Sequence, residues 1–435
     1  MSGSESTTVL RRRLLAAVLL GAAAASVPAL ADDHPTAAAS RGFWVAGDLH
    51  VHTIYGHDTC ITPTQAWDPD STDRAARRDC EAPYTVGFTP AQRLQEAADR
   101  GLGFVAISDH NNVVNQSDPE LLAWLAEHPG FTFVPAYENS QPGHVQMLGA
   151  TGCYANSGLV PGATINCDRA VVDRSAVGET ALRDALRADG GVFQVNHPSD
   201  GNWPSTFGYA VVPDTVEVWN IGPWAYQHPF PASNDNDLSL QWYDGFLQRG
   251  DEVGVTGGSD THWVTTDAGQ GVGEPTTWVY VVPGDDGTLT YRNVLDGLKA
   301  HHTFVSALPP ALHGPQLFLE EDRSRHGRFD AMAGDEVGPH AAFRIRTVGA
   351  LPGSVLRIVT DTGSAELPLG GATTYDFTPG TDGVPAAAVF VRAELLMPDG
   401  RAVRTTACDP LVGTGTTVCR DDLAMESLTS PIFIR

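Results

Sequence analysis

Short apolar runs recur along residues 43–282, and segments with helical periodicity separate many of them. Apolar runs bounded by Gly, Pro, Asn and Asp predict buried β-strands. Strands that alternate with helices form a largely parallel sheet, either closed as a barrel or open and doubly wound. The expected strands are Phe43–Leu49, Phe104–Ser108, Phe131–Tyr137, Val145–Ala150, Val192–Val195, Val216–Trp219, Val253–Thr256 and Trp278–Val282.

Capping signals mark helices between these strands. Thr89 followed by Pro90 provides an N-cap and a proline at the first helical position, and Gly101 stands just past the expected end. Asp118 followed by Pro119 repeats the start signal. Two further helices are expected over Gly178–Ala188 and Leu238–Gln248.

The pattern changes after Pro309, where short β-like runs separated by Gly, Pro and Asp replace the helical segments. This texture predicts a β-sandwich of roughly Ig type over residues 311–435, following an α/β domain over 43–310. The expected strands are Gln316–Glu320, Ala342–Val348, Val355–Thr360, Ala388–Leu396 and Ile432–Ile434.

The first residues have the order of a cleavable signal peptide. Arg11–Arg13 precede an apolar run from Leu14 to Ala25, and Ala29–Ala31 form a small-residue cleavage site. We therefore expect a signal peptide over 1–31, a linker over 32–42, and a secreted or periplasmic protein. The apolar run is shorter than the roughly 20 residues of a membrane span. Consecutive arginines also fit twin-arginine export.

The net charge of the chain excludes some classes of binding partner. The 435 residues contain 27 basic and 52 acidic side chains, a formal net charge of −25, and Lys299 is the only lysine. Nucleic-acid binding needs a basic surface that neutralises phosphates, so nucleic acid is not expected as a partner. A membrane partner is not expected after signal cleavage. The expected partner is a small-molecule substrate.

The six cysteines are even in number and fall into three local pairs, with no Cys-x-x-Cys spacing. In an exported protein this spacing predicts loop-closing disulfides rather than a zinc ribbon or a catalytic thiol. The pairs expected from proximity are Cys60 with Cys80, Cys153 with Cys167, and Cys408 with Cys419.

Six of the fifteen histidines fall at the ends of expected strands, each in a short polar motif. In His50-Val51-His52, the period of two along a strand directs both imidazoles to one side, so one metal could take both. Strand ends of a parallel barrel open on one face, so these motifs should converge. The others are Ser108-Asp109-His110, Tyr137-Glu138, Gly143-His144, Asn196-His197-Pro198 and Ser259-Asp260-Thr261-His262.

Together and in this order, the motifs resemble those of the PHP (polymerase and histidinol phosphatase) superfamily, over about residues 43–310. Residues 47–53, 216–220 and 430–432 most resemble the CehA/McbA-like metallohydrolases, which append a β domain. The resemblance implies a distorted (β/α)7 TIM-like barrel with two or three divalent ions. Because imidazole and carboxylate are mixed, Zn, Mn or Fe suits the site better than Ca or Mg.

The resemblance also implies a ligand set. His50, His52, Glu138 and Asp260 would hold one metal; Asp58, His110 and His262 a second; and Glu138, as a bridge, with His144 and His197 a third. Asp58 stands where the family has His or Asp, and the adjacent His57 could replace it. Asp109 is either a partner of the His110 imidazole that shuttles a proton or a cap of its loop.

Such a cluster predicts an exported metal-dependent hydrolase that uses a metal-bridged hydroxide, because paired cations acidify a water between them. A phosphoesterase is the first expectation. A carbamate, carboxylic ester or amide hydrolase, as the CehA-like features imply, is the alternative. A non-catalytic metal-binding exported protein is a third possibility, which missing ligands would have indicated.

Overall fold

The computed structural model describes residues 42–56, 88–140, 143–161, 167, 170, 173–199, 202–222, 236–262, 271–323, 326–339, 341–381, 383–398 and 423–435. The expected signal peptide and almost all of the expected linker lie outside these ranges. So do His57, Asp58 and the cysteines of the first and third expected pairs.

Helices begin where the capping signals placed them. The Thr89 side chain accepts the backbone N–H of Gln92 in a capping box, and Asp118 accepts those of Glu120 and Leu121. None of the described helices is long and apolar enough to span a bilayer. The described helices are α2 (Pro90–Asp99), α3 (Pro119–Glu127), α4 (Ala176–Ala188), α5 (Trp203–Phe207), α6 (Asn236–Gln248), α7 (Tyr291–Lys299) and the 3-10 turns Val114–Ser117 and Pro310–Leu312.

Every strand expected before residue 300 is present, with ends shifted by a few residues. The pattern did not predict the two-residue strands at 138–139, 154–155 and 158–159, or the four-residue strand at 303–306. In this part of the chain the strands are β1 (Phe43–Val51), β2 (Phe104–Ile107), β3 (Thr132–Pro135), β4 (Glu138–Asn139), β5 (Val145–Leu148), β6 (Tyr154–Ala155), β7 (Gly158–Leu159), β8 (Val192–Val195), β9 (Thr215–Asn220), β10 (Gly254–Gly258), β11 (Thr276–Val281) and β12 (Thr303–Ser306).

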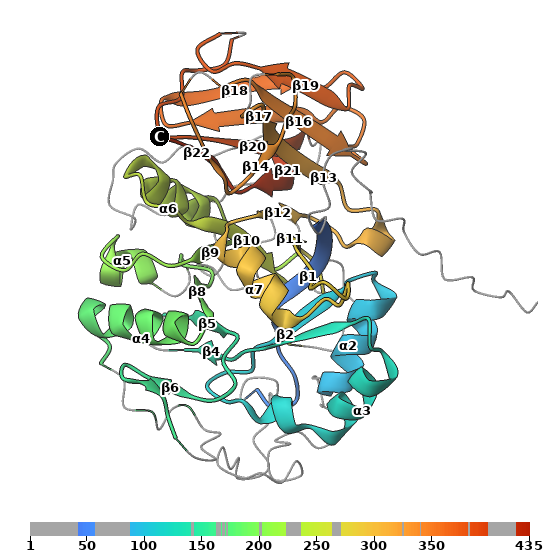
Figure 1. Ribbon diagram of the computed structural model, residues 1–435, viewed down its shortest axis with the longest axis vertical. Coiled ribbons are helices and arrows are strands. Elements are labelled where there is room, and N and C mark those ends of the chain that lie inside the picture. Colours follow the sequence, from blue (N-terminus) through green and yellow to red (C-terminus); the bar gives the residue numbers. More distant parts are fainter. Residues whose placement is uncertain are drawn as a thin grey trace, which may run out of the picture. The chain divides into compact units, whose positions relative to one another are not determined.

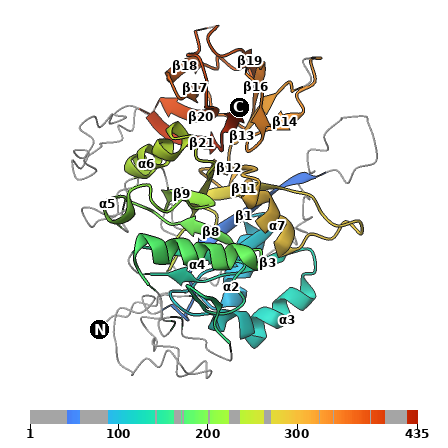
Figure 2. The same ribbon diagram turned by 60° about the vertical axis from the view of Figure 1, so that its left-hand side comes forward.

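Except for β6 and β7, which pair only with each other, these strands form a mixed α/β arrangement in two sheets (Figure 1). One sheet contains β11-β1-β2-β3 and the other β10-β9-β8-β5-β4. Helix α4 packs on β8 and helix α7 on β11, as Figure 2 shows from a second side. Among the described residues no sheet closes, so the expected (β/α)7 barrel is not shown.

The sheets are also less parallel than the sequence predicts. The pairs β1–β2, β2–β3, β8–β9 and β9–β10 are parallel, but β1–β11, β4–β5 and β5–β8 are antiparallel. Each junction between the two sheets carries a single bridge instead of a ladder, Val51 with Thr261 and His110 with Glu138.

The strands after residue 310 belong to two sheets that pack against each other around one hydrophobic core. Leu319 and Ile345 from the four-stranded sheet pack with Ile358 and Val391 from the longer sheet. Two packed sheets agree with the expected sandwich, whereas the Ig-type topology stays a prediction. The strands are β13 (Gln316–Glu321), β14 (Ala331–Met332), β15 (Glu336–Val337), β16 (Phe343–Val348), β17 (Val355–Thr360), β18 (Gly363–Pro368), β19 (Thr374–Phe377), β20 (Phe390–Pro398), β21 (Leu423–Thr429) and β22 (Ile432–Ile434).

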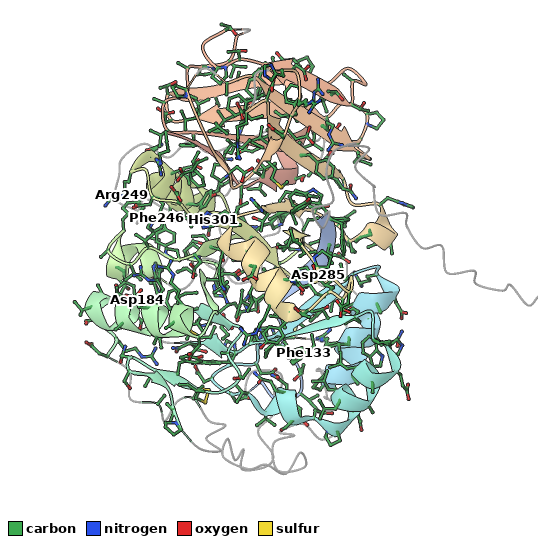
Figure 3. The ribbon with its side chains drawn as sticks, in the orientation of Figure 1. Phe133, Asp184, Phe246, Arg249, Asp285 and His301 are labelled. Atoms are coloured by element: carbon green, nitrogen blue, oxygen red, sulfur yellow. A yellow bond between two sulfur atoms is a disulfide. The ribbon has the colours of Figure 1, made fainter. Side chains whose placement is uncertain are left out.

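The expected division at residue 310 stays a prediction, and one sheet runs across it. β12 pairs with β21 in antiparallel register, which joins β11 and β1 to the C-terminal strands in one eleven-stranded sheet. His301, labelled in Figure 3, follows α7 and lies with its ring centroid 6.0 Å from that of Phe433 in β22.

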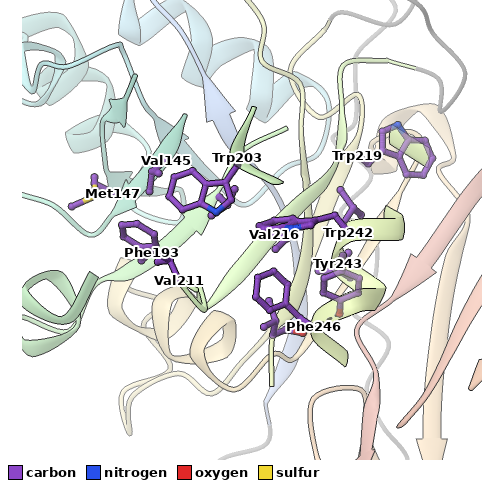
Figure 4. Close-up of a cluster of buried hydrophobic side chains, with 14 of the residues drawn as sticks. Val145, Met147, Phe193, Trp203, Val211, Val216, Trp219, Trp242, Tyr243 and Phe246 are labelled. Carbon is purple, nitrogen blue, oxygen red and sulfur yellow. Dashed lines mark hydrogen bonds between the residues drawn. The ribbon is translucent and has the colours of Figure 1, made fainter. Parts of the chain in front are cut away.

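The largest hydrophobic core also draws on both parts of the chain. Trp203, Trp219 and Phe246 are among its large side chains (Figure 4), and Met425 and Leu428 of β21 belong to the same cluster. Trp219 is fully buried and its indole N–H donates to the carbonyl of Gly222 at 2.8 Å, so it packs within the core. This core supports the strand ends that carry the histidine motifs.

Candidate metal centre

The His-x-His motif ends β1 with both imidazoles on one side of the strand, as the period of two predicts. His50 and His52 are fully buried, and their Nε2 atoms lie 3.0 Å apart. Two ring nitrogens at this distance repel each other unless one carries a proton or both face a cation. The close approach of these two nitrogens therefore favours a cation or a shared proton beside them.

Glu138, on the short strand β4, lies at the centre of the imidazoles. Its Oε2 is 3.3 Å from His50 Nε2, 3.4 Å from His52 Nε2 and 3.1 Å from His110 Nδ1. Its Oε1 is 2.9 Å from His144 Nδ1 and 3.4 Å from His197 Nε2. One carboxylate thus contacts imidazoles from five separate positions of the chain.

His144 reaches this carboxylate from the start of a strand rather than from its end. Because β5 runs antiparallel to β8, the beginning of β5 lies at the same edge as the end of β8. The antiparallel strand therefore places His144 beside His197. His144 is also the most open of these imidazoles, with 30% of its side chain exposed.

Asp260 forms a second carboxylate centre after β10. Its Oδ1 is 3.2 Å from His50 Nε2, 3.1 Å from His52 Nε2 and 3.5 Å from His262 Nδ1, and its Oδ2 is 3.9 Å from His197 Nε2. Asp260 and His197 have φ values of 49° and 23°, in the left-handed region that non-glycine residues avoid. Both expected ligands therefore sit in a backbone conformation that costs free energy.

The structure thus brings together every expected ligand that it describes. Four overlapping groups have ligand atoms within 4.8 Å of one another. The allocation of these ligands to single ions that the resemblance implies stays a prediction, and Asp58 and His57 lie outside the described residues. The groups are His52-His110-His262, His50-His197-Asp260, His50-His52-Glu138 and His110-Glu138-His144.

Electrostatics at the cluster reflect opposite charges packed in a dry site. Burial alone would raise the pKa of Glu138, but His144, His50 and His110 hold it well below its ordinary value. Burial would lower the pKa of His50, yet Asp260, Glu217 and Glu138 raise it well above. Burial likewise opposes protonation of His197, but Glu138 and Asp260 raise its pKa to about 9. The carboxylates therefore stay ionised and draw protons or metal ions to the imidazoles.

The residues fit divalent metal ions better than protons alone. Among the described residues, Oε2 of Glu138 has no hydrogen-bond partner, although three imidazole nitrogens lie within 3.4 Å of it. A buried carboxylate oxygen normally accepts hydrogen bonds. Nitrogen and oxygen atoms that converge without hydrogen-bond geometry are the arrangement of a ligand shell, and this donor set suits borderline metals.

Glu217 is a site residue that the sequence reasoning missed. It is fully buried on β9, and its Oε1 and Oε2 lie 3.0 and 3.2 Å from His50 Nδ1. A carboxylate behind a ligating imidazole fixes its tautomer and orientation. A Cβ at Gly258 would lie 2.4 Å from Glu217 Oε1, so the glycine permits this approach. The available signal was a lone carboxylate within the apolar run Val216–Trp219.

The carboxylate of Asp109 forms its hydrogen bonds with loop residues. Its carboxylate accepts the backbone N–H and the hydroxyl of Thr53, both at 2.7 Å, and the Asn115 amide at 2.8 Å. Of the two expected roles, these contacts favour the cap of the loop after β1.

Arg93 of α2 holds together two backbone segments of the metal centre. Its guanidinium donates to the carbonyls of His52 at 3.1 Å and Thr261 at 3.4 Å. It therefore ties together the two segments that carry the His-x-His motif and Asp260. This buried cation binds the backbone of the site, not its open side.

One expected disulfide is described. Cys153 and Cys167 are bonded, with Cα atoms 4.9 Å apart, and the Cys167 N–H donates to the carbonyl of Asn111 at 2.6 Å. Asn111 directly follows His110, so the crosslinked loop contacts the metal-centre edge. The pairs Cys60–Cys80 and Cys408–Cys419 lie outside the described residues.

Comparisons with known proteins give little beyond this geometry. No protein-family model matches the chain, and no curated protein matches it. Among solved structures, it resembles one from Bifidobacterium adolescentis, described provisionally as a metal-dependent phosphoesterase, with 16% identity over 57% of this chain and 95% of that one. The TM-score of 0.31 does not establish a shared fold. The side-chain geometry itself indicates a centre that could hold divalent metal ions.

Proposed function

We propose that this chain is a metal-dependent hydrolase of the PHP type, with phosphate esters as its first substrate class. The observation that supports this most is Glu138, whose two oxygens contact five imidazoles in a fully buried position. In a structural histidine core the buried ring nitrogens would find backbone or hydroxyl partners, as His110 Nδ1 does with Ser140 Oγ at 2.6 Å, whereas His52 Nδ1 has none among the described residues. Six imidazoles around two carboxylates are the composition of a multinuclear ligand set.

The chain's own residues would hold the ions and shape the site around them. Bound ions of the Zn, Mn or Fe class would supply an acidified water and neutralise the charge that develops on the substrate. Glu138 and Asp260 provide the negative charge, and Glu217 orients the His50 imidazole. His144 and His262 keep 30% and 16% of their side chains exposed. Substrate would enter on the side of these two residues.

A carbamate, carboxylic ester or amide hydrolase, as in the CehA/McbA-like group, is the alternative. Arg93, the buried cation nearest the motif loops in the contacts above, is engaged by backbone carbonyls and by Glu96 at 3.0 Å. A substrate phosphate would therefore rely on the ions rather than on this guanidinium for charge neutralisation. A neutral ester needs less such neutralisation.

Export is part of the proposal. The Cys153–Cys167 disulfide supports an oxidising compartment, since such bonds persist mainly outside the cytosol. The signal-peptide pattern over residues 1–31 points the same way.

The test is elemental analysis of the purified protein followed by assays of the same sample on p-nitrophenyl phosphate and on an aryl acetate or carbamate. We expect two or three ions per chain, as the ligand resemblance implies, and turnover of one ester class. His52→Ala should lose metal and turnover, while the control His313→Ala, at an exposed position outside the cluster, keeps both. Bound metal without turnover of any ester would favour a binding protein, and no metal retention would refute the proposal.

A further inference from the structure

Asn220, the last residue of β9, lies against two carboxylates of the metal centre, Glu217 and Asp260. Its backbone N–H donates to Asn236 Oδ1 at 3.0 Å, and Asn236 Nδ2 donates back to its carbonyl at 3.3 Å. The first residue of α6 thus clamps the backbone of Asn220. The side chain is only 1% exposed, so its amide occupies a fixed and buried position.

The orientation of this amide follows from its neighbours. Nδ2 donates to Glu217 Oε2 at 2.9 Å and to Asp260 Oδ2 at 3.3 Å. The flipped amide would place an oxygen against two carboxylates, and three acceptors cannot pair. The donor end of Asn220 therefore faces the carboxylates, and Oδ1 is the end left for another group.

Among the described residues, Oδ1 of Asn220 has no hydrogen-bond partner. A buried acceptor without a donor is destabilising, and such groups are few in folded proteins. Asn196, on the same wall, is a contrast. Its Nδ2 donates to Glu138 Oε1 at 2.9 Å and its Oδ1 accepts from Gln194 at 3.0 Å. Two asparagines thus contact the two central carboxylates, and only the oxygen of Asn196 is satisfied by the described chain.

We propose that Asn220 Oδ1 accepts a hydrogen bond from an N–H or O–H group of the molecule bound at the cluster. Asn220 is then a specificity-determining residue that selects substrates with a donor beside the scissile bond. Ester carbonyl and ionised phosphoryl oxygens are acceptors and cannot satisfy Oδ1. A site that holds a buried acceptor discriminates against ligands without the matching donor. This inference rests on the proposed function, because it needs a molecule bound at the ions.

The test uses two small chelating ligands that differ at one group, so it does not depend on knowing the substrate. Acetohydroxamic acid carries an N–H beside its metal-binding oxygens, and N-methylacetohydroxamic acid has a methyl group there. Dissociation constants of both for the metal-loaded full-length protein are measured by calorimetry. We expect about tenfold tighter binding of the N–H form, as for one buried hydrogen bond.

Variants separate this hydrogen bond from the steric effect of the methyl group. Asn220→Ala should bring the ratio of the two dissociation constants close to one. Asn220→Ser takes its place if the alanine variant does not fold. Asn196→Ala, whose oxygen is already bonded to Gln194, should keep the wild-type ratio. The metal content of each variant is measured alongside.

The outcomes are distinct. A ratio that collapses only at Asn220 supports the inference. Equal binding of the two hydroxamates by metal-loaded wild type, or an unchanged ratio in both Asn220 variants, overturns it and leaves the proposed function standing. Loss of one ion in Asn220→Ala would instead assign the Asn220 side chain to metal retention, through Oδ1 or through its contacts with Glu217 and Asp260, and would also overturn the inference. Absence of bound metal in wild type refutes the proposed function, and this inference falls with it.

Discussion

Glu217→Gln offers the sharpest test of the site, because it changes one charge behind a ligand without removing a ligand. Glu217 accepts from His50 Nδ1 at 3.0 and 3.2 Å, from the His197 N–H at 3.2 Å and from Asn220 Nδ2 at 2.9 Å. Glutamine keeps the shape but has one acceptor oxygen and no charge. Its NH2 group must then face one of these three donors.

The expected loss is in metal affinity rather than in folding. Partners behind a metal-ligating histidine contribute about 10- to 100-fold in affinity or activity, which corresponds to about 1.4–2.8 kcal/mol. Metal affinity would be measured by competition with a chromophoric chelator, with circular dichroism to confirm folding. We expect Glu217→Gln to bind metal at least about tenfold more weakly than wild type.

Glu179→Gln is the matched control. Glu179 is also a fully buried glutamate, but it lies on α4 and pairs with Arg174 at 3.6 Å. Burial raises its pKa to about 7, so its replacement changes stability at neutral pH without touching the cluster. Wild-type affinity in Glu217→Gln, or equal losses in both variants, would refute the role assigned to Glu217.

Three other predictions follow from the packing. Gly258→Ala should weaken metal binding and lower stability by about 1–3 kcal/mol in a denaturant titration, since the new Cβ would lie 2.5 Å from that of His50; unchanged stability would contradict this contact. Burial lowers the pKa of His301 to about 4 from an ordinary 6.5, so its stabilising contribution is complete above pH 6.5 and is lost as the pH falls through 4. His301→Asn should therefore lose less stability than wild type between pH 7.5 and 5, by on the order of 2 kcal/mol, and parallel losses would argue against a buried neutral imidazole. A chain truncated after Pro309 should unfold or aggregate, because β12 loses its pairing with β21; a soluble, metal-bound fragment would show instead that residues 43–309 fold alone.

Local signals predicted much of the fold correctly. Thr89 and Asp118 cap helices because their side chains satisfy N–H groups of the first turn within three residues, which the sequence shows directly. His50 and His52 share a face because strand periodicity is also local. These features depend on neighbours along the chain, so no knowledge of the tertiary structure was needed.

Features set by distant pairing could not be predicted in the same way. The apolar run of β11 reads like any parallel strand, but it pairs with β1 in antiparallel register. Nothing in the run specifies its direction, because both faces of a buried strand are apolar in either case. Similarly, residues after Pro309 read as a separate domain, while β21 extends the sheet that contains β1.

The histidine motifs predicted, as a group, the residues that the structure brings together at the metal centre. The residues whose side-chain oxygens support these candidate ligands were not predicted. His110, His144 and His197 stand in recognisable motifs, whereas Glu217 and Asn220 are single polar residues in an apolar strand. Their role follows only from contacts with His50 and Asp260, on other strands. The loop role of Asp109 likewise required its contacts with Thr53.

The left-handed backbone at Asn111, His197 and Asp260 lowers the stability of the folded chain at residues of the metal centre. Each such non-glycine position costs on the order of 1–3 kcal/mol, and metal ions repay this only when they are bound. Laboratory evolution for heat resistance in the presence of a chelator should therefore accumulate glycine at His197 and Asp260. The same selection with metal present should retain the histidine and the aspartate, so the availability of the ion during selection would decide whether the centre persists.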